Sequence, residues 1–186
     1  GYSKKIMEKL FIEANNEKNI FCCTRFGNVA GSNGSVIPFW LNCKNQGKPL
    51  PLTDENMTRL MLDGKEVSSI IERCIYECEQ KSGGFILSKM MKKILLKDLA
   101  NKISDKIELV GLRPGEELME SLISEEELIF TRVDKDYIFI LNRENTDKTT
   151  RLKNPLSSSN ATKMTNSELR NLVEYVKENN TNTMTY

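Results

Sequence analysis

Short apolar runs alternate with amphipathic stretches along this chain, and this alternation restricts its possible folds more than any other feature. Residues 66–80 place apolar side chains at helical spacing and are followed by the apolar run 85–87. Residues 93–103 repeat the helical spacing and are followed by the run 107–111. Because these runs are short and bounded by turn residues, they indicate strands. Helix followed by strand, twice in succession, is typical of an α/β fold.

Further elements follow from the same patterns. Residues 2–14 and 35–45 have the spacing of helices, and the apolar run 20–25 indicates a buried strand. Nearer the C-terminus, the alternating residues 137–141 indicate a strand of a peripheral hairpin, and the polar stretch 142–160 indicates a long loop. The chain is therefore expected to contain helices and strands along most of its length.

A capping box marks the start of the last helix. Thr165 and Glu168 have the spacing at which the two residues exchange hydrogen bonds at a helix N-terminus. Apolar residues follow at helical spacing from Leu169 to Val176. Residues 178–186 are expected to be frayed or disordered.

The composition excludes several classes of function. The 186 residues include 27 Lys+Arg and 26 Asp+Glu, and the resulting net charge of +1 favours neither nucleic acid nor an acidic membrane as a partner. No apolar run approaches the ~20 residues that a membrane-spanning helix needs. The N-terminus also lacks the pattern of a signal peptide. We therefore expect a cytoplasmic protein that is not inserted in a membrane.

The cysteine and histidine contents limit the available chemistry. The five cysteines lack the paired spacing of a disulfide framework or a zinc site, so we expect reduced thiols in the core and no metal site. The sequence contains no histidine, which removes the usual imidazole base and the Ser-His and Cys-His nucleophiles. Any chemistry must therefore depend on Lys, Tyr, carboxylates or a cofactor.

Four segments carry small and charged residues that a stable fold alone does not require. The first, residues 24–35, is a strand end that runs into a Gly/Ser/Asn-rich loop and then into a helix N-terminus. Exposed backbone N–H groups and the helix dipole make such a turn suitable for phosphate oxygens. A plain strand-to-helix connection explains the same pattern equally well.

The second segment, residues 51–59, ends in Arg59, directly before the apolar run 60–62. The planar guanidinium of arginine can bind a phosphate through two hydrogen bonds. Taken alone, the segment favours the competing interpretation, in which Arg59 forms a surface ion pair with Asp54 or Glu55.

The third and fourth segments each offer a cation. Residues 112–116 form a rigid turn after a strand and present Arg113 and Glu116 at the same edge. A cation suits phosphate and a carboxylate suits ribose hydroxyls, although a salt bridge across the turn is an equally simple explanation. Lys4, in the first turn of the opening helix, is by itself most simply a solvated charge.

Taken together and in order, these segments resemble the C-terminal half of the UDP-N-acetylglucosamine 4,6-dehydratases. These enzymes form a polysaccharide-biosynthesis branch of the extended short-chain dehydrogenase/reductase family. The resemblance covers roughly residues 1–175. It rests on TRFGNVAGSNGSVIPFW (24–40), GKPLPLTDENMTR (47–59), SGGFILSKMMKKILLKDLA (82–100), VGLRPGEELMESLIS (110–124) and LSSSNATKMTNSELRNLV (156–173).

The resemblance implies a role for individual residues. Lys4 matches the last position of the family's Tyr-x-x-x-Lys motif, whose tyrosine position would directly precede Gly1. In such enzymes this catalytic lysine bonds the nicotinamide ribose and lowers the pKa of the tyrosine. Tyr2 is two residues from Lys4 and cannot replace a tyrosine that is needed one helical turn away. The implied cofactor-binding residues are Lys4, Phe26, Gly27 and Val29.

The implied substrate is a UDP-sugar. Asn28 would bond the diphosphate, and Val36 would lie near the uracil. Arg59 and Arg113 would hold the pyrophosphate, and Glu116 would hold the uridine ribose. The full set of implied substrate-binding residues is Asn28, Ser35, Val36, Thr53, Met57, Arg59, Arg113 and Glu116.

The implied reaction belongs to a complete enzyme. Bound NAD or NADP oxidises the hexose at C4, water is eliminated across C5 and C6, and the hydride returns to C6. The cofactor would be held mainly by an N-terminal half outside this sequence, and the complete protein would be a homo-oligomer. A C4 epimerase, a dehydratase with C5 epimerisation and a non-catalytic nucleotide-sugar-binding module remain as alternatives.

The expected architecture is α/β, with the C-terminal part of a Rossmann-like parallel sheet and a small α/β substrate-binding domain. The sequence does not begin with Met and opens within a helix, so we expect a catalytically incomplete piece that is poorly stable or associates through its exposed sheet edge. The expected division is the end of the dinucleotide-binding domain at 1–35, the substrate domain at 36–124, a C-terminal hairpin, loop and helix at 125–177, and the tail at 178–186.

Overall fold

The computed structural model describes residues 2–81 and 83–180, and the chain divides into two compact units. Each unit is built from three separate stretches of the chain. The first unit comprises Gly1–Phe26, Lys65–Met90 and Leu122–Leu156, and the second comprises Gly27–Gly64, Met91–Ser121 and Ser157–Tyr186.

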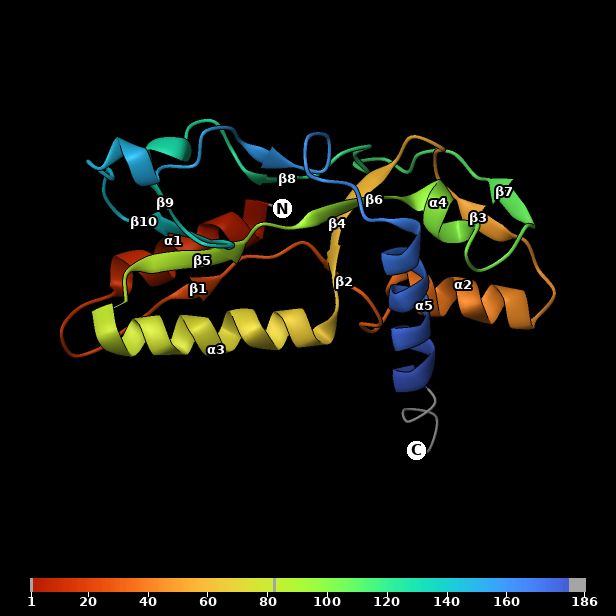
Figure 1. Ribbon diagram of the computed structural model, residues 1–186, viewed down its shortest axis with the longest axis horizontal. Helices are drawn as coiled ribbons and strands as arrows, with labels where there is room; N and C mark the ends of the chain where they lie inside the picture. The colour runs from red at the N-terminus through yellow and green to blue at the C-terminus, as the bar shows by residue number, and fades with distance from the viewer. Residues whose placement is uncertain (1, 82, 181–186) are drawn as a thin grey trace. The chain divides into compact units, whose positions relative to one another are not determined.

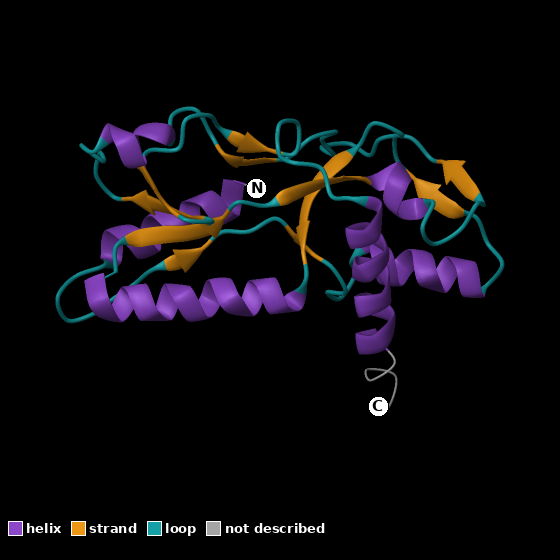
Figure 2. Ribbon diagram, in the orientation of Figure 1, coloured by secondary structure: helices purple, strands orange, loops and turns teal. Residues whose placement is uncertain are grey.

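A four-stranded mixed sheet forms the centre of the first unit (Figure 2). Its strands, in spatial order, are β1 (Cys23–Thr24), β5 (Phe85–Lys89), β10 (Tyr137–Leu141) and β9 (Thr131–Asp134). Strand β1 is parallel to β5, whereas β10 is antiparallel to both β5 and β9. Residues 85–88 are all buried, as expected for an inner strand with a continuous apolar sequence. The strand predicted at 20–25 is confirmed, but only two of its residues are in the ladder.

The hairpin predicted near residues 125–141 is also confirmed. Strands β9 and β10 turn at Lys135, which has a left-handed φ of 55°. Strand β10 pairs with β5 along its full length, so that the hairpin extends the central sheet of this unit. The 3-10 helices η1 (Leu128–Phe130) and η2 (Lys148–Thr150) precede and follow the hairpin.

Two helices belong to the first unit, and both confirm the sequence prediction. Helix α1 (Tyr2–Ala14) lies beside β1 and β5, and α3 (Gly64–Lys81) precedes β5 (Figure 1). None of the described side chains of α1 is buried, and its apolar residues Ile6, Leu10 and Phe11 are all exposed. Helix α1 is therefore fixed less by apolar burial than by the ion pairs described below.

The second unit contains two small sheets. Strands β2 (Asn28–Val29), β4 (Thr58–Leu62) and β6 (Lys92–Leu95) form one, and β3 (Leu50–Leu52) pairs with β7 (Ile107–Leu109) in the other. Strand β2 is parallel to β4, and β6 is antiparallel to it. The short strands β8 (Ser121–Ile123) and β11 (Leu156–Ser157) lie where the chain passes from one unit to the other.

Three helices complete the second unit: α2 (Val36–Asn45), α4 (Leu96–Ala100) and α5 (Asn166–Asn180). Helices α2 and α5 pack on one another, as Figure 1 shows (orange and blue). Trp40 is buried in this core, and its Nε1–H donates to the Pro51 carbonyl at 2.9 Å, which satisfies the indole. The core of the unit includes Ile37, Trp40, Leu50, Ile94, Leu99, Leu172 and Val176.

The capping box that the sequence predicts at the start of α5 is confirmed. The Thr165 N–H donates to Glu168 Oε2 at 2.8 Å, and the Glu168 N–H donates to Thr165 Oγ1 at 3.2 Å. Lys92 pairs with the same carboxylate, and these interactions lower the pKa of Glu168 to about 2. Of the tail predicted at 178–186, residues 178–180 continue α5, and residues 181–186 lie outside the described part of the chain.

The helix predicted over residues 93–103 is wrong in its first part. Residues 92–95 are strand β6, and only 96–100 form helix α4. The apolar residues in this stretch fit the spacing of a helix and that of a strand. Pairing with β4 decides for the strand, because it buries Ile94 completely.

No helix in the described part of the chain is long and apolar enough to span a membrane.

Three of the five cysteines lie close together in the first unit, and all five are free thiols. The sulfur atoms of Cys74 and Cys22 are 3.2 Å apart. Desolvation by burial raises the pKa of Cys22 to about 11 and that of Cys78 to about 12, and it also raises the pKa of Cys74. Since the thiolate is the reactive form, these thiols are protonated and unreactive near neutral pH.

We expect iodoacetamide at pH 8 to alkylate Cys22, Cys74 and Cys78 much more slowly in the native chain than in the urea-unfolded chain. Because their pKa values are raised in the folded state, these thiols ionise first in the unfolded state, and their protonation favours folding. This contribution to the free energy of unfolding is complete below about pH 8.5, the ordinary thiol pKa, and is lost as the pH rises above it. Mass spectrometry of the labelled peptides measures the rates, and equally fast labelling of the two states would contradict the burial of these thiols.

Candidate functional site

The predicted site residue Asn28 lies in β2, which approaches β4 unusually closely at the preceding residue. A Cβ atom on Gly27 would lie 2.5 Å from the Leu60 carbonyl oxygen, so that a glycine is required there. The Gly27 N–H donates to the sulfur of Met91 at 3.3 Å, and Asn28 is in register with Met61. Because β2 and β4 pack so closely, the Asn28 side chain lies within hydrogen-bonding distance of the backbone of β4.

The side-chain amide of Asn28 is oriented by two acceptors. Its Nδ2 donates to the Leu60 carbonyl at 3.1 Å and to Glu120 Oε2 at 2.7 Å. A backbone carbonyl can only accept, so this arrangement identifies which end of the amide is the nitrogen. Both amide hydrogens are thereby used, and Oδ1, which has no hydrogen-bond partner among the residues that the structure describes, remains for a ligand.

Arg59, in β4, is the central cation of the second unit. Its side chain is only 13% exposed, and its Nε lies 3.3 Å from Glu120 Oε1. One terminal nitrogen donates to the carbonyls of Thr58 (2.8 Å) and Leu118 (3.3 Å), and the other is 4.0 Å from Glu116 Oε1. The expected surface alternative is not found, because Glu55 pairs with Lys97.

The turn at 112–116 brings Glu116 toward Arg59. The Arg113 N–H donates to Glu116 Oε2 at 3.2 Å, which fixes the carboxylate across the turn. The salt bridge considered between the Arg113 and Glu116 side chains is not formed; the carboxylate faces Arg59 instead. Arg113 is exposed and has no ion pair with any described residue.

Two residues of this network were missed in the sequence, Glu120 and Ser158. Besides its contacts with Asn28 and Arg59, the Glu120 carboxylate accepts a backbone hydrogen bond from Leu60. Desolvation by burial raises the pKa of Glu120, and the Arg59 charge acts against this shift. Glu120 lies within the acidic string GEELME, and nothing in the sequence distinguishes it from its acidic neighbours.

Ser158 connects the backbone of β4 to the segment that carries Glu120. It is completely buried, and its Oγ accepts from the Glu120 N–H and from Thr58 Oγ1, both at 2.8 Å. Its own N–H donates to the Glu120 carbonyl at 2.8 Å. Ser158 lies in the SSSN string at 157–160, but no binding role was predicted for it.

The other predicted substrate residues also fall in the second unit. Ser35 caps α2, and its Oγ is buried without a hydrogen-bond partner among the described residues. Val36 is partly buried against the core, Thr53 is partly buried after β3, and Met57 is buried before β4. The orphaned Ser35 hydroxyl is a further polar group available to a ligand.

Two predicted cofactor residues, Lys4 and Phe26, belong to the first unit. Lys4 is exposed in the first turn of α1, and Phe26 is partly buried after β1. Val29, assigned to the same cofactor, lies in β2 beside Asn28 and is partly buried.

Helix α1 is held to the first unit by a buried ion triad. The Arg25 guanidinium forms two hydrogen bonds with the Glu8 carboxylate, at 2.9 and 2.7 Å, and another with Glu127 at 2.9 Å. Burial acts to lower the pKa of Arg25, but these carboxylates outweigh it and raise the pKa. The triad is therefore a permanently charged structural contact.

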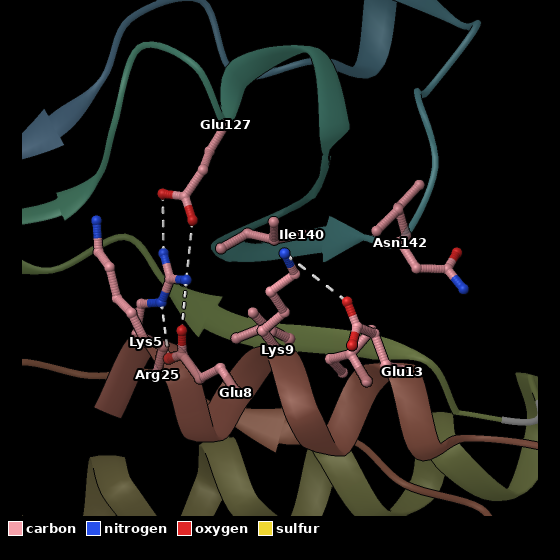
Figure 3. A pocket seen from close by; sticks show the side chains of 11 residues that line it. Lys5, Glu8, Lys9, Glu13, Arg25, Glu127, Ile140 and Asn142 are labelled. Carbon is pink, nitrogen blue, oxygen red and sulfur yellow. Dashed lines mark hydrogen bonds and ion pairs between the residues drawn. The ribbon is translucent and has the colours of Figure 1, made fainter. Parts of the chain in front are cut away.

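A pocket of about 360 Å³ lies beside this triad (Figure 3). Its lining includes Lys5, Glu8, Lys9, Arg25, Glu127 and Asn142. None of the twelve site residues predicted from the sequence lines it. The most buried cation in its lining, Arg25, is already paired with two carboxylates.

Residues 1–142 match the family described as Polysaccharide biosynthesis protein. The chain belongs to this family. Two curated relatives of this chain are a UDP-glucose 4-epimerase from Rickettsia rickettsii and a UDP-N-acetylglucosamine 4,6-dehydratase (inverting) from Campylobacter jejuni. Each is 33% identical over 147 residues, which are 74% and 75% of this chain and 42% and 43% of the relatives. The chain thus spans less than half the length of these relatives.

Solved structures show the same fold. Pen from Bacillus thuringiensis superposes with a TM-score of 0.81 at 28% identity, over 94% of this chain and 56% of that one. A dTDP-glucose 4,6-dehydratase from Bacillus anthracis, solved in complex with NAD, has a TM-score of 0.51 at 15% identity, over 96% of this chain and 51% of that one. The predicted α/β, Rossmann-like class of this polysaccharide biosynthesis family member is confirmed.

The approach of β2 to β4 generates a stability prediction. We expect Gly27→Ala to destabilise the chain by about 1–3 kcal/mol, the usual cost of overpacking, because the new Cβ would meet the rigid Leu60 backbone. Urea unfolding followed by circular dichroism measures the change.

Gly47→Ala is the matched control. Gly47 has a φ of +69° but open space around it, so this variant should show only the cost of a left-handed alanine, about 1–2 kcal/mol. The close approach is refuted if Gly27→Ala unfolds at the same urea concentration as the wild type.

Proposed function

We propose that this chain is the nucleotide-sugar-binding part of a UDP-N-acetylglucosamine 4,6-dehydratase that makes precursors of surface polysaccharides. One observation carries the proposal: Asn28, Arg59 and Glu116, predicted from three separate segments, are joined in one network in the second unit. The membership of the polysaccharide biosynthesis family and the dehydratase relative from Campylobacter jejuni support the same activity.

The proposed substrate is a UDP-sugar held by complementary polar groups. Arg113 is an exposed cation on a rigid turn, which suits one oxygen pair of the pyrophosphate. Arg59 adds a second cation, and the Glu116 carboxylate can accept hydrogen bonds from ribose hydroxyls. Ser35 and Val36, at the N-terminus of α2, provide a hydroxyl and an apolar surface for the uridine.

The proposed cofactor is NAD or NADP, which supplies the hydride acceptor and donor when it is bound. The described residues fit only its nicotinamide end. In the first unit, Lys4 is exposed and offers ammonium hydrogens that suit ribose hydroxyls, and Phe26 offers apolar surface. The sequence has no glycine-rich dinucleotide turn, so these residues would hold one end of the cofactor.

A UDP-sugar 4-epimerase is the second candidate. The relative from Rickettsia rickettsii supports it, with the same identity as the dehydratase relative over an equal number of residues. The two activities differ in product, because a dehydratase releases a 4-keto-6-deoxy sugar nucleotide and an epimerase releases the C4 epimer. Incubating the complete protein with UDP-N-acetylglucosamine and identifying the product by mass spectrometry and NMR separates them.

Binding by the chain itself tests the shared part of the proposal. We expect calorimetry to detect UDP-N-acetylglucosamine, and Arg113→Ala to weaken it by at least ~1.5 kcal/mol, the scale of a lost charge-assisted hydrogen bond. The variant should fold normally, because the Arg113 side chain is exposed.

Arg170→Ala is the control, since it removes an equal charge from an exposed position of α5 in the same unit. It should bind as the wild type does. The proposal fails for this chain if the folded wild type does not bind UDP-N-acetylglucosamine, or if both variants weaken binding equally.

A further inference from the structure

The carboxylate of Glu120 contacts two side chains of the candidate site, Asn28 and Arg59, which lie on different strands. One oxygen accepts from Asn28 on β2 at 2.7 Å, and the other lies 3.3 Å from Arg59 on β4. A backbone hydrogen bond from Leu60 adds a third contact. These contacts come from two neighbouring strands, and Glu120 is the only described residue whose side chain binds the side chains of both Asn28 and Arg59.

The backbone of Glu120 is itself held by hydrogen bonds to Ser158. Its N–H donates to the Oγ of the completely buried Ser158, and its carbonyl accepts from the Ser158 N–H, both at 2.8 Å. Ser158 Oγ also accepts from Thr58 Oγ1 at 2.8 Å, next to Arg59 in β4. The Glu120 backbone is therefore fixed relative to the strand that carries Arg59.

The contacts made by Glu120 determine what Asn28 can offer. Because Leu60 and Glu120 take both hydrogens of Asn28 Nδ2, the group left for a ligand is the acceptor Oδ1. An ionised diphosphate has only acceptor oxygens and cannot bond to Oδ1. A sugar hydroxyl or an acetamido N–H can donate to it. In this arrangement, the diphosphate role expected for Asn28 passes to the arginines.

We infer that Glu120 is a positioning residue of the nucleotide-sugar site: it fixes the Asn28 amide as an acceptor for a donor group of the sugar and holds Arg59 in place for the diphosphate. The inference rests on the proposed function, since it assigns a task within that site. Glu120 need not touch the ligand. It acts through the two side chains that it holds.

Two substitutions separate the two contacts. Glu120→Ala removes both, so we expect affinity for UDP-N-acetylglucosamine to fall about tenfold or more, the scale of a lost hydrogen bond to a charged group. Glu120→Gln keeps a carbonyl that can accept from Asn28, but it places no charge beside Arg59. Its loss of affinity should therefore be smaller than that of Glu120→Ala.

NMR provides a readout that a purely structural role would not change. In the wild type, both Asn28 Nδ2 hydrogens should exchange slowly with solvent. The protection of the hydrogen bonded to Glu120 should disappear in Glu120→Ala and persist in Glu120→Gln, whereas the hydrogen bonded to the Leu60 carbonyl keeps its partner in both. The Arg59 Nε–H signal should shift in both variants. Glu117→Gln is the matched control, because Glu117 is an exposed carboxylate in the same segment and its loss should change neither signal nor affinity.

The possible outcomes distinguish the inference from the proposed function. If wild-type chain binds UDP-N-acetylglucosamine and the folded Glu120 variants bind equally well, the proposed function stands and the inference is overturned. Tighter binding by Glu120→Gln also overturns it, since Glu120 would then compete with the diphosphate for Arg59. If the folded wild type does not bind, the proposed function fails. Independently of binding, unchanged NMR signals of Asn28 and Arg59 in the Glu120 variants would overturn the positioning role.

Discussion

The close approach of β2 to β4 at Gly27 is the constraint on which the candidate site depends. Only a residue without a side chain allows the Leu60 carbonyl to come so near, and that carbonyl is one of the two acceptors that orient Asn28. The glycine thus does more than relieve crowding. It sets the distance at which side chains from two neighbouring strands can share one carboxylate, so a change in backbone packing would alter the polar network directly.

Both units place an arginine between two carboxylates. Arg25 lies between Glu8 and Glu127, and Arg59 lies between Glu116 and Glu120. Burying a charge is costly unless its hydrogen bonds are satisfied, and such pairs often give geometric specificity more than net stability. Arg25 has close, bidentate contacts. Arg59 is held more loosely, with one carboxylate only at 4.0 Å, and its geometry therefore leaves more scope for a ligand to compete.

The sequence predicted the elements that depend on local chemistry. The α5 capping box, the Pro38-containing helix α2 and the apolar strand β5 all follow from residues close together in the chain. Residues 92–95 were assigned wrongly because their apolar spacing suits helix and strand alike, and the partner strand that decides lies more than thirty residues away. Local pattern cannot resolve a choice made by distant pairing.

The same limit explains which site residues could be found. Arg59 and Arg113 could be predicted as site residues because their segments, taken together, resemble a known family, although each segment alone had a simple structural explanation. Glu120 resembled any other acidic residue in an acidic segment. Its significance comes from Asn28, ninety-two positions earlier, and from Ser158, thirty-eight positions later. A hydrogen-bonded carboxylate acquires its role from its partners, and sequence spacing does not reveal partners that the fold brings together.

The chemistry of the described site also explains why this part of the chain resembles dehydratases and epimerases equally. Arg59, Arg113 and Glu116 offer charge and hydrogen bonds suited to a nucleotide diphosphate and a ribose, which are common to every UDP-sugar. Such contacts bind substrate and transition state alike and do not determine which bond of the hexose reacts. Equal identity to an epimerase and a dehydratase is therefore expected of a segment whose proposed task is binding. Within this network, the acceptor Oδ1 of Asn28 is the group best placed to depend on the sugar itself, because it needs a donor that the diphosphate lacks.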